Sequence, residues 1–444
     1  MTKECPQEVV TVPTLNGEET DMMCSNMCAQ AIPQINKKSS QTELSVLKLI
    51  QMSPSISRVE LSKLSGLSSA AITGVIGGLI SKGFLVEERS VVKTIGRKRV
   101  ALSLRPSLGS VIGIDLGTFN LRIVVTDLNG EILAKCEVKT EMWRGREGVL
   151  ERCFTLVRET LSLAGADVAK VLGIGVAFSG VIDVQNGWIL SYPRLGQMEQ
   201  WRNVPLKKII EDEFGVPCLL EDSVRAVATS EKFLGAGQGL KDFVYVDVGV
   251  GVGASIFIDG QIYRGFNGSA GEFGHMTVDE DGPLCCCGSS GCLEAVATCT
   301  TIIETVRIAI EKGVASKTLE LAGVDPSAIT IEIIAQAAEQ NDSLAYRALS
   351  EAASHIGAAA ADLVNLLNPQ AIIFGGALFR SAPTLLLEQV RRVVRHRAME
   401  KSANDVSLLV SPLQSDAGSR GMARLIAADL VKSIYMNGYS GESL

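Results

Sequence analysis

Several features that would define other classes of protein are missing from this sequence. No stretch of its 444 residues approaches the run of about eighteen apolar residues that a membrane-spanning helix requires, so we expect no transmembrane segment. The first residues, MTKECPQEVV, do not place a basic segment before an apolar one, so we expect no secretory signal. Eleven cysteines without an export signal predict a reducing, cytoplasmic location, where thiols bind metal or lie in the core.

Length and composition predict a globular protein with more than one domain. A chain of 444 residues exceeds one ordinary domain, and 46% hydrophobic with 20% charged residues indicates a sizeable core. Residues 1–40 show little periodicity and are interrupted by Pro13 and Pro33, which predicts a disordered tail. Cys24 and Cys28 lie in this tail, but two cysteines without a histidine are half a zinc site.

The stretch AGEFGHMTVDEDGPLCCCGSSGCLE, residues 270–294, combines one of only three histidines with four cysteines. Zinc prefers four tetrahedral imidazole or thiolate ligands, and one such set is His275, Cys285, Cys287 and Cys292. Cys286 is then a spare thiol. Gly288 and Gly291 let the short loop fold back toward one ion. The alternative is a cluster of buried or redox-active thiols without metal.

This stretch resembles the signature of the ROK family, which is named for repressors, open reading frames and sugar kinases. The likeness rests on Gly-His, nine residues, and then Cys-x-Cys-Gly-x-x-Gly-Cys-Leu-Glu. In that family the Cys and His positions hold a structural zinc. The resemblance also implies that Glu272, His275 and Glu294 contact sugar hydroxyls, for which carboxylates are good acceptors. For the two glutamates, the alternative is a role as solvated loop acids.

Residues 41–105 have the layout of a winged helix-turn-helix. Apolar residues at helical spacing predict one helix ending near Pro54 and a second closed by Gly66. Ser68 is a candidate N-cap for a third helix, whose apolar face contains Ile72, Val75, Ile76 and Leu79. Two β-strands, FLVEE and RVALSL, follow, and the loop between them is basic.

The charge of this segment favours DNA as its partner. It contains ten basic and four acidic residues, a net charge of +6 in a chain whose net charge is −7. We expect Ser68, Ser69 and Thr73 to face the major groove, and the loop residues Arg97, Lys98 and Arg99 to contact the phosphate backbone or minor groove. The alternative is an ordinary solvated three-helix cap.

Three glycines are unusual in the predicted third helix, because each costs up to about 1 kcal/mol relative to alanine. They are Gly74, Gly77 and Gly78. Close approach of the helix backbone to DNA, or to the second helix, would account for them.

Residues 106–444 read as an α/β body. Two β-rich segments, starting near Val111 and Phe243, are each followed by helices, which predicts two lobes with a cleft between them. This pattern resembles the actin-like ATPase, or ribonuclease H-like, fold of the sugar kinases. The ROK resemblance runs from about Val111 to about Ala428. A winged helix in front of this body is the arrangement of the family's repressors.

The kinase motifs of the family are altered here. ROK kinases open with Asp-x-Gly-Gly-Thr, whereas this chain has Asp115-Leu-Gly-Thr-Phe119, so a phenylalanine replaces the hydroxyl residue. The second phosphate loop, Gly-Thr-Gly-x-Gly in kinases, is GVGVG at residues 249–253 and also lacks a hydroxyl. The catalytic base, the Asp of Glu-Asn-Asp, aligns with Ser223, and a serine hydroxyl cannot accept the proton as a carboxylate does. A shift of one residue would place Asp222 there.

The sugar side of the predicted cleft is partly retained. Gly180 lies in FSGVID, which is similar to the family's Gly-x-Val-Asp loop, and Asp222 is the second candidate from this lobe. Arg194 replaces an asparagine that holds the sugar in relatives, which raises a sugar acid or sugar phosphate as an alternative ligand.

These observations predict a cytoplasmic transcriptional regulator, a repressor of carbohydrate genes that is not an enzyme. We expect it to bind a palindromic double-stranded DNA operator as a homodimer or dimer of dimers, to respond to a carbohydrate effector, to hold Zn2+, and not to bind membranes. One alternative is a ROK-type ATP-dependent sugar kinase with an accessory DNA-binding domain. Another is a constitutive DNA-binding protein with a vestigial cleft.

Overall fold

The chain forms two compact units in a computed structural model that describes residues 41–53, 56–89, 100–166, 168–192 and 200–437. The first unit contains the described residues up to Ser230 and from Ser415 onward, and the second runs from Glu231 to Gln414. The tail predicted over residues 1–40 lies outside the described residues. The domain boundaries at 41–105 and 106–444 stay predictions, since the first unit includes the N-terminal module and part of the body.

The N-terminal module is a winged helix-turn-helix, as predicted. Its elements are α1 (Gln41–Met52), β1 (Ile56–Ser57), α2 (Arg58–Ser65), α3 (Ser69–Ser81), β2 (Leu85–Arg89) and β3 (Val100–Leu104). The three strands are antiparallel in the order β1-β3-β2. Helices α2 and α3 are bent by 114° relative to each other, within the range of about 90–120° that is typical of this motif.

Small polar residues and one glycine form the turn between α2 and α3. The hydroxyl of Ser57 and the carboxylate of Glu60 form a capping box at the start of α2. Gly66 ends α2 with a φ of 70°, a conformation that favours glycine. The Ser68 hydroxyl then accepts the N–H of Ala71 at 3.2 Å and caps α3, as predicted.

The core of the module continues into the rest of the first unit. Ile72, Ile76 and Leu79 of α3 are fully buried, which confirms most of the predicted apolar face. The same hydrophobic cluster includes Val111 and Ile426 from outside the module. Burying such side chains contributes about 1.5–3 kcal/mol each to stability. The module is therefore held to the rest of the first unit by hydrophobic packing as well as by the chain that links them.

No single helix among the described residues is long and apolar enough to cross a membrane. Taken together, α2 and α3 have the length and composition of a membrane-spanning segment, but the two helices are bent by 114° relative to each other.

The rest of the first unit is a five-stranded sheet with helices. Its elements are β4 (Ser110–Leu116), β5 (Asn120–Asp127), β6 (Ile132–Lys139), α4 (Gly145–Ala164), β7 (Val171–Phe178), β8 (Val181–Asp183), β9 (Trp188–Ser191), α5 (Leu206–Phe214), β10 (Cys218–Asp222), the first part of α6 (Ser223–Leu234) and α15 (Ala417–Asn437). The strand order is β10-β7-β4-β5-β6, with β4-β5-β6 antiparallel and β4-β7-β10 parallel. Every residue of β4 is buried, as expected for a central strand covered on both faces.

The second unit repeats this topology. Its elements are β11 (Phe243–Val248), β12 (Val252–Ile258), β13 (Gln261–Tyr263), α7 (Leu293–Ala297), α8 (Cys299–Glu311), α9 (Lys317–Leu321), α10 (Ile331–Glu339), α11 (Ser343–Leu367), β14 (Ala371–Gly375), α12 (Gly376–Ser381), α13 (Pro383–Arg397), α14 (Glu400–Asp405) and β15 (Ser407–Val410). The order β13-β12-β11-β14-β15 has the same parallel and antiparallel pairs. The repeat is that of a two-lobed, ribonuclease H-like fold, as predicted.

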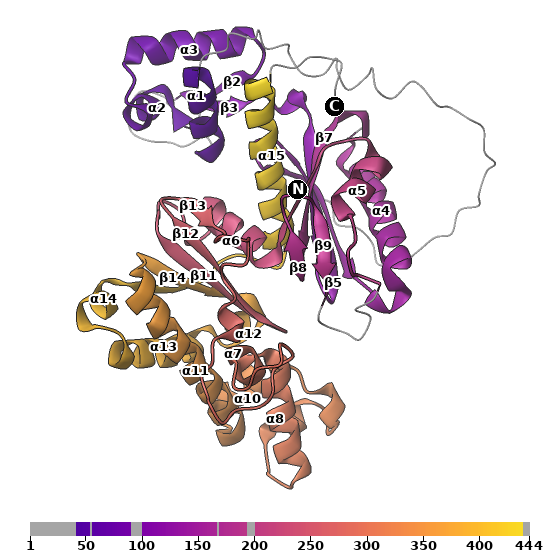
Figure 1. Cartoon of the computed structure of the whole chain (residues 1–444), viewed down its shortest axis with the longest axis vertical. Helices are drawn as coiled ribbons and strands as arrows, with labels where there is room; N and C mark the ends of the chain where they lie inside the picture. Colours follow the sequence, from indigo (N-terminus) through magenta and orange to yellow (C-terminus); the bar gives the residue numbers. More distant parts are fainter. Residues whose placement is uncertain (1–40, 54–55, 90–99, 167, 193–199, 438–444) are drawn as a thin grey trace, which may run out of the picture. The chain divides into compact units, whose positions relative to one another are not determined.

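Helix α15 lies against the sheet of the first unit and reaches the module. It packs on β4, β7 and α1, and Figure 1 shows it in yellow between the module and β7. A Cβ on Gly113 of β4 would lie 1.8 Å from the Ser419 carbonyl oxygen, and one on Gly175 of β7 would lie 2.5 Å from that of Met422. Glycine therefore lets the helix backbone approach both strands.

Candidate metal centre and ligand-binding residues

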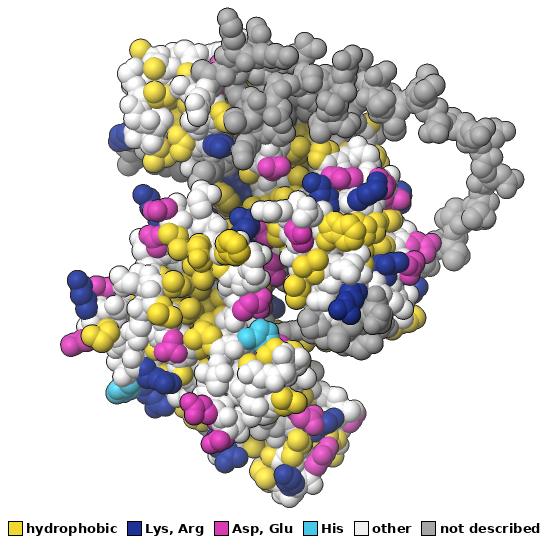
Figure 2. All heavy atoms as spheres, viewed as in Figure 1, with side chains coloured by type: hydrophobic (Ala, Val, Ile, Leu, Met, Phe, Trp, Pro, Cys, Tyr) yellow, Lys and Arg dark blue, Asp and Glu magenta, His cyan; other side chains and the backbone are white. Residues whose placement is uncertain are grey.

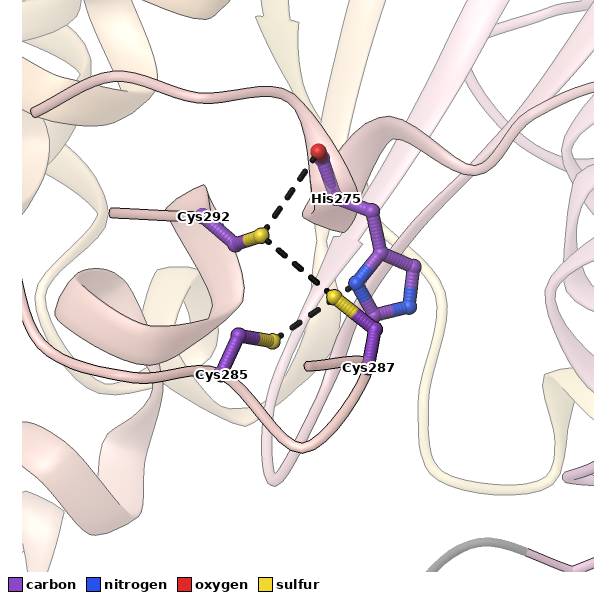
Figure 3. Close-up of side chains that lie close together, drawn as sticks. All are labelled: His275, Cys285, Cys287 and Cys292. Carbon is purple, nitrogen blue, oxygen red and sulfur yellow. Dashed lines mark hydrogen bonds between the residues drawn. The ribbon is translucent and has the colours of Figure 1, made fainter. Parts of the chain in front are cut away.

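Four side chains of the second unit gather around one point. They are His275, Cys285, Cys287 and Cys292, whose ligand atoms all lie within 4.8 Å of one another. The Cys285 Sγ lies 3.7 Å from His275 Nδ1, and the Cys287 Sγ lies 3.7 Å from the Cys292 Sγ. Figure 3 shows the sulfur atoms and the imidazole turned toward one another. The structure thus brings together the residues that the spacing predicts as metal ligands.

The spacing of these atoms suits a tetrahedral ion. Zinc-to-sulfur bonds of about 2.3 Å place two sulfurs about 3.8 Å apart, close to the 3.7 Å between Cys287 and Cys292. Metal binding requires thiolates. Burial raises the pKa of Cys292 to about 12, so binding a metal there releases a proton. The donor set therefore fits a structural ion with no open position.

A tight loop holds the cysteines in place. The Cys285 N–H donates to the Ser289 carbonyl at 2.7 Å. Gly288 and Gly291 have φ values of 90° and 66°, so both adopt the conformation that favours glycine. A Cβ on Gly291 would lie 1.5 Å from the Asp279 carbonyl oxygen. Both glycines therefore allow the fold-back that the sequence predicts.

Glu272 and Glu294, two residues that are predicted to bind a sugar, lie beside the cluster. The His275 Nε2, on the far side of the ring from Cys285, lies 3.9 Å from a Glu272 oxygen, and the Glu272 side chain is 66% exposed. The Glu294 Oε2 accepts the N–H of Val252 at 3.0 Å, and its Oε1 lies 3.6 Å from the Cys286 thiol. Glu294 thus also fixes the start of β12, a contact that sequence reasoning missed. Sugar binding by these residues stays a prediction.

The residues at the start of α6, in the first unit, form a hydroxyl pair beside a capping carboxylate. The Ser179 hydroxyl donates to that of Ser223 at 3.0 Å; that Ser223 occupies the position of the kinase base stays a prediction. The Asp222 Oδ1 accepts the N–H groups of Val224 and Arg225 at 2.9 and 3.1 Å. Burial raises the pKa of Asp222 to about 6, although Arg225 and these N–H groups lower it. The structural role of Asp222 is therefore to cap the start of α6.

The predicted sugar residue Gly180 has a packing role of its own. A Cβ there would lie 2.7 Å from Phe178 Cε1 and 2.8 Å from the Ser191 carbonyl oxygen. Glycine is needed at this position whether or not a sugar binds.

An arginine that the sequence did not single out pairs with the aspartate that opens the predicted first phosphate motif. Arg122 on β5 lies directly opposite Asp115 on β4 and Glu137 on β6. Its Nη1 donates to the Asp115 carboxylate at 3.1 Å, and its Nε donates to Glu137 at 3.0 Å. Asp115 is only 8% exposed. The guanidinium therefore neutralises the carboxylate that opens this motif.

Thr118 and Phe119 are the last two residues of the same motif. The Tyr192 hydroxyl donates to the Thr118 hydroxyl at 2.6 Å, so this threonine is engaged within the protein. The Phe119 ring is 51% exposed. That the ring crowds a nucleotide stays a prediction.

The predicted DNA-contacting residues of α3 lie on one surface. Ser68, Ser69 and Thr73 are all exposed. A Cβ added to Gly74 or Gly77 would meet nothing within 4 Å. Close packing against α2 therefore does not explain these two glycines. The other explanation, close approach of the exposed helix backbone to DNA, stays a prediction. The predicted wing residues Arg97, Lys98 and Arg99 lie outside the described residues.

A buried arginine joins the module to the body within the first unit. Arg424 of α15 is 6% exposed and donates to the carbonyl oxygens of Gln51, in the last turn of α1, and of Asn129. The Asn129 amide pairs with both backbone groups of Leu104 at 2.8 Å. Burial lowers the pKa of Arg424 to about 10, a shift that Asp127 opposes, so the side chain is charged at neutral pH.

These features define a class: a winged helix-turn-helix on a two-lobed, ribonuclease H-like body of the sugar kinase type. The sequence profile of the ROK family matches residues 111–429, and the chain belongs to this family. The chain is 32% identical over 401 residues to the xylose repressor of Caldicellulosiruptor bescii, covering 90% of this chain and 97% of the repressor.

Two solved structures are also similar. One is a ROK family transcriptional regulator described as a homolog of the E. coli MLC protein, with a TM-score of 0.73 and 30% identity over 89% of this chain and 98% of that one. The other is a ROK family glucokinase from Streptomyces griseus in complex with glucose and AMPPNP, with a TM-score of 0.62 and 31% identity. It covers 73% of this chain and 100% of its own.

Proposed function

We propose that this chain is a sugar-responsive transcriptional repressor without kinase activity. The observation that carries the proposal is the ion pair in the first kinase motif, where Arg122 neutralises Asp115, and it is supported by the predicted alignment of Ser223 with the base of the kinases. A serine hydroxyl cannot accept the sugar proton at neutral pH. The likeness to a xylose repressor over 97% of its length supports a regulator of carbohydrate genes that acts in the cytoplasm.

The winged module supplies DNA binding in this proposal. Ser68, Ser69 and Thr73 face the major groove, while the cationic wing residues Arg97, Lys98 and Arg99 contact the phosphate backbone or minor groove. A homodimer, or a dimer of dimers, presents two modules to a palindromic operator. Because phosphate contacts release counterions, operator affinity falls steeply with salt.

The body supplies the effector site and a structural zinc site. The candidate sugar contacts of the second unit are Glu272, His275 and Glu294, and those of the first unit are Gly180 and Asp222. The metal ligands are His275, Cys285, Cys287 and Cys292, which Zn2+ would cross-link when bound. His275 then serves both groups, because its Nδ1 faces the thiols and its Nε2 faces Glu272.

Helix α15 links the sheet of the first unit, including β7 and β10, to helix α1 of the DNA-binding module. A Cβ on Gly418, in its first turn, would lie 2.9 Å from the Asp115 carboxylate, and Arg424, further along, binds the end of α1. The module therefore moves with the first unit, and sugar binding changes the spacing of the two modules in a dimer. Such couplings are commonly about 1–3 kcal/mol.

Gel-shift titration on a selected operator tests this function. We expect one sugar of a panel that begins with xylose to change operator affinity by about 5- to 150-fold. Neutralising Arg97, Lys98 and Arg99 to glutamine should weaken binding to every sequence and flatten its salt dependence. Affinity that is insensitive to all sugars and to the wing substitutions would contradict the proposal.

One observation favours a kinase instead. The Asp222 carboxylate adjoins the position of the base, and its pKa of about 6 suits proton transfer. Its Oδ1 is, however, held by two backbone N–H groups. A coupled ATP-turnover assay separates the two functions: sugar-dependent turnover that Asp222→Asn abolishes would establish the kinase.

A further inference from the structure

We propose that the second unit holds a separate site for a single phosphate group, in the hollow between α13 and α14. The hollow has a volume of about 100 Å³. Its floor is apolar and includes Val394 and Leu408, which are both buried. Its rim is polar, because Arg391 and Arg395 reach it from α13 and Asn404 reaches it from α14.

Both rim arginines line the hollow, and Arg395 is exposed to solvent. They are four residues apart, so they lie one above the other on the same face of α13. Within residues 231–414, all of which the structure describes, neither guanidinium has a hydrogen bond or an ion pair. Arg391 is half-buried, and a partly buried charge without a partner is costly. A phosphate would satisfy the donors of both side chains.

Charge is concentrated at this place. The second unit has 13 Lys and Arg residues and 21 Asp and Glu residues, yet five of its cations and one acid, Glu400, fall between Arg391 and Lys401. Figure 2 shows Lys and Arg side chains gathered beside a histidine where Figure 1 draws α13 and α14. The dipole of α13 favours cations in its last turn, but Arg391 lies earlier than that turn and still lines the hollow.

The chemistry of the hollow selects a phosphate monoester or inorganic phosphate. Arginine presents a planar fork that matches two phosphate oxygens, and the Asn404 amide adds a neutral donor. A volume of about 100 Å³ suits one phosphate group better than an extended polyanion. None of the residues that line this site is a proposed sugar or DNA contact. An experiment that refutes the site therefore leaves the proposed function untouched, and the reverse also holds.

Calorimetric titration of the full-length protein tests the site. Inorganic phosphate, glucose 6-phosphate and, as an uncharged reference, glucose are titrated at an ionic strength held constant with chloride. We expect saturable binding of one phosphate per chain, unaffected by whether glucose is present. Arg391→Gln and Arg395→Gln should each weaken it by about tenfold or more, because each removes a charged hydrogen-bond donor.

The helix offers a matched control. Arg392→Gln removes the same charge from the neighbouring position, and Arg392 is exposed but does not line the hollow. Binding should be unchanged in that variant, and thermal melts in chloride should match for all three. Equal weakening in Arg392→Gln, phosphate binding no stronger than chloride, or displacement of phosphate by a short DNA duplex would each overturn the assignment.

Discussion

Replacing Arg424 with methionine should loosen the winged module from the body. The guanidinium donates to carbonyl oxygens of Gln51 in α1 and of Asn129 in the β5–β6 turn. Methionine fills much of the same space but donates to neither. The carbonyl of the buried Gln51 and that of the half-buried Asn129 would then both lack this donor.

The size of the effect follows from these two contacts. A hydrogen bond from a charged group contributes about 1.5–3 kcal/mol, and removing a buried charge returns part of its desolvation cost. We therefore expect the attachment of the module to weaken by about 2–4 kcal/mol. For a module of this size, that loss lowers the unfolding temperature by about 10 °C or more.

Differential scanning calorimetry of the full-length protein measures this change. The variant should show a module transition that separates from that of the body and moves to lower temperature. In gel shifts, the variant should still bind operator DNA but respond less to the effector, because the module no longer moves with α15.

Arg420→Met is the matched control. Arg420 lies one turn earlier on α15, and its side chain forms no hydrogen bond or ion pair among the described residues. Its melt and sugar response should resemble those of the parent protein. A change below about 0.5 kcal/mol in Arg424→Met, the range of ordinary surface substitutions, with an intact sugar response, would refute the reasoning.

Three further changes have defined outcomes. The protein should contain about one zinc per chain; Cys287→Ser should lose it and melt earlier, whereas the neighbouring Cys286→Ser should retain it. The pKa of Asp222 is about 6 when folded, against about 3.9 when unfolded, so the folded state holds this proton longer. The free energy of unfolding should fall as pH rises from about 4 to 6, and Asp222→Asn should flatten that slope. Gly77→Ala should stabilise α3 by up to about 1 kcal/mol yet weaken operator binding.

Each of these has a contrary result. Zinc retained in Cys287→Ser would remove that residue from the ligand set. An unchanged pH slope in Asp222→Asn would mean that other groups set it. Operator affinity unaffected by Gly77→Ala would mean that this face of α3 does not approach DNA.

Local features of the molecule can be predicted from the sequence. Ser68 and Gly66 mark the helix-turn-helix because caps and left-handed glycines act over a few residues. The cluster from His275 to Cys292 is readable for the same reason, since all four ligands fall within eighteen residues.

Long-range contacts are not readable in this way. The pairing of Arg122 with Asp115 depends on the exact register of β4 and β5, which an alternating pattern does not specify. Arg424 finds its partners 295 and 373 residues away along the chain. The contact of Glu294 with the backbone of Val252 likewise depends on how two separate segments pack.

Selection of genomic DNA fragments by the purified, zinc-loaded protein tests the repressor function most directly, when it is repeated with a panel of sugars and sugar phosphates. We predict enrichment of palindromic sites beside carbohydrate genes, with one sugar changing the recovery of those sites. No enrichment from fully folded protein, or enrichment that no sugar alters together with sugar-dependent ATP turnover, would contradict it.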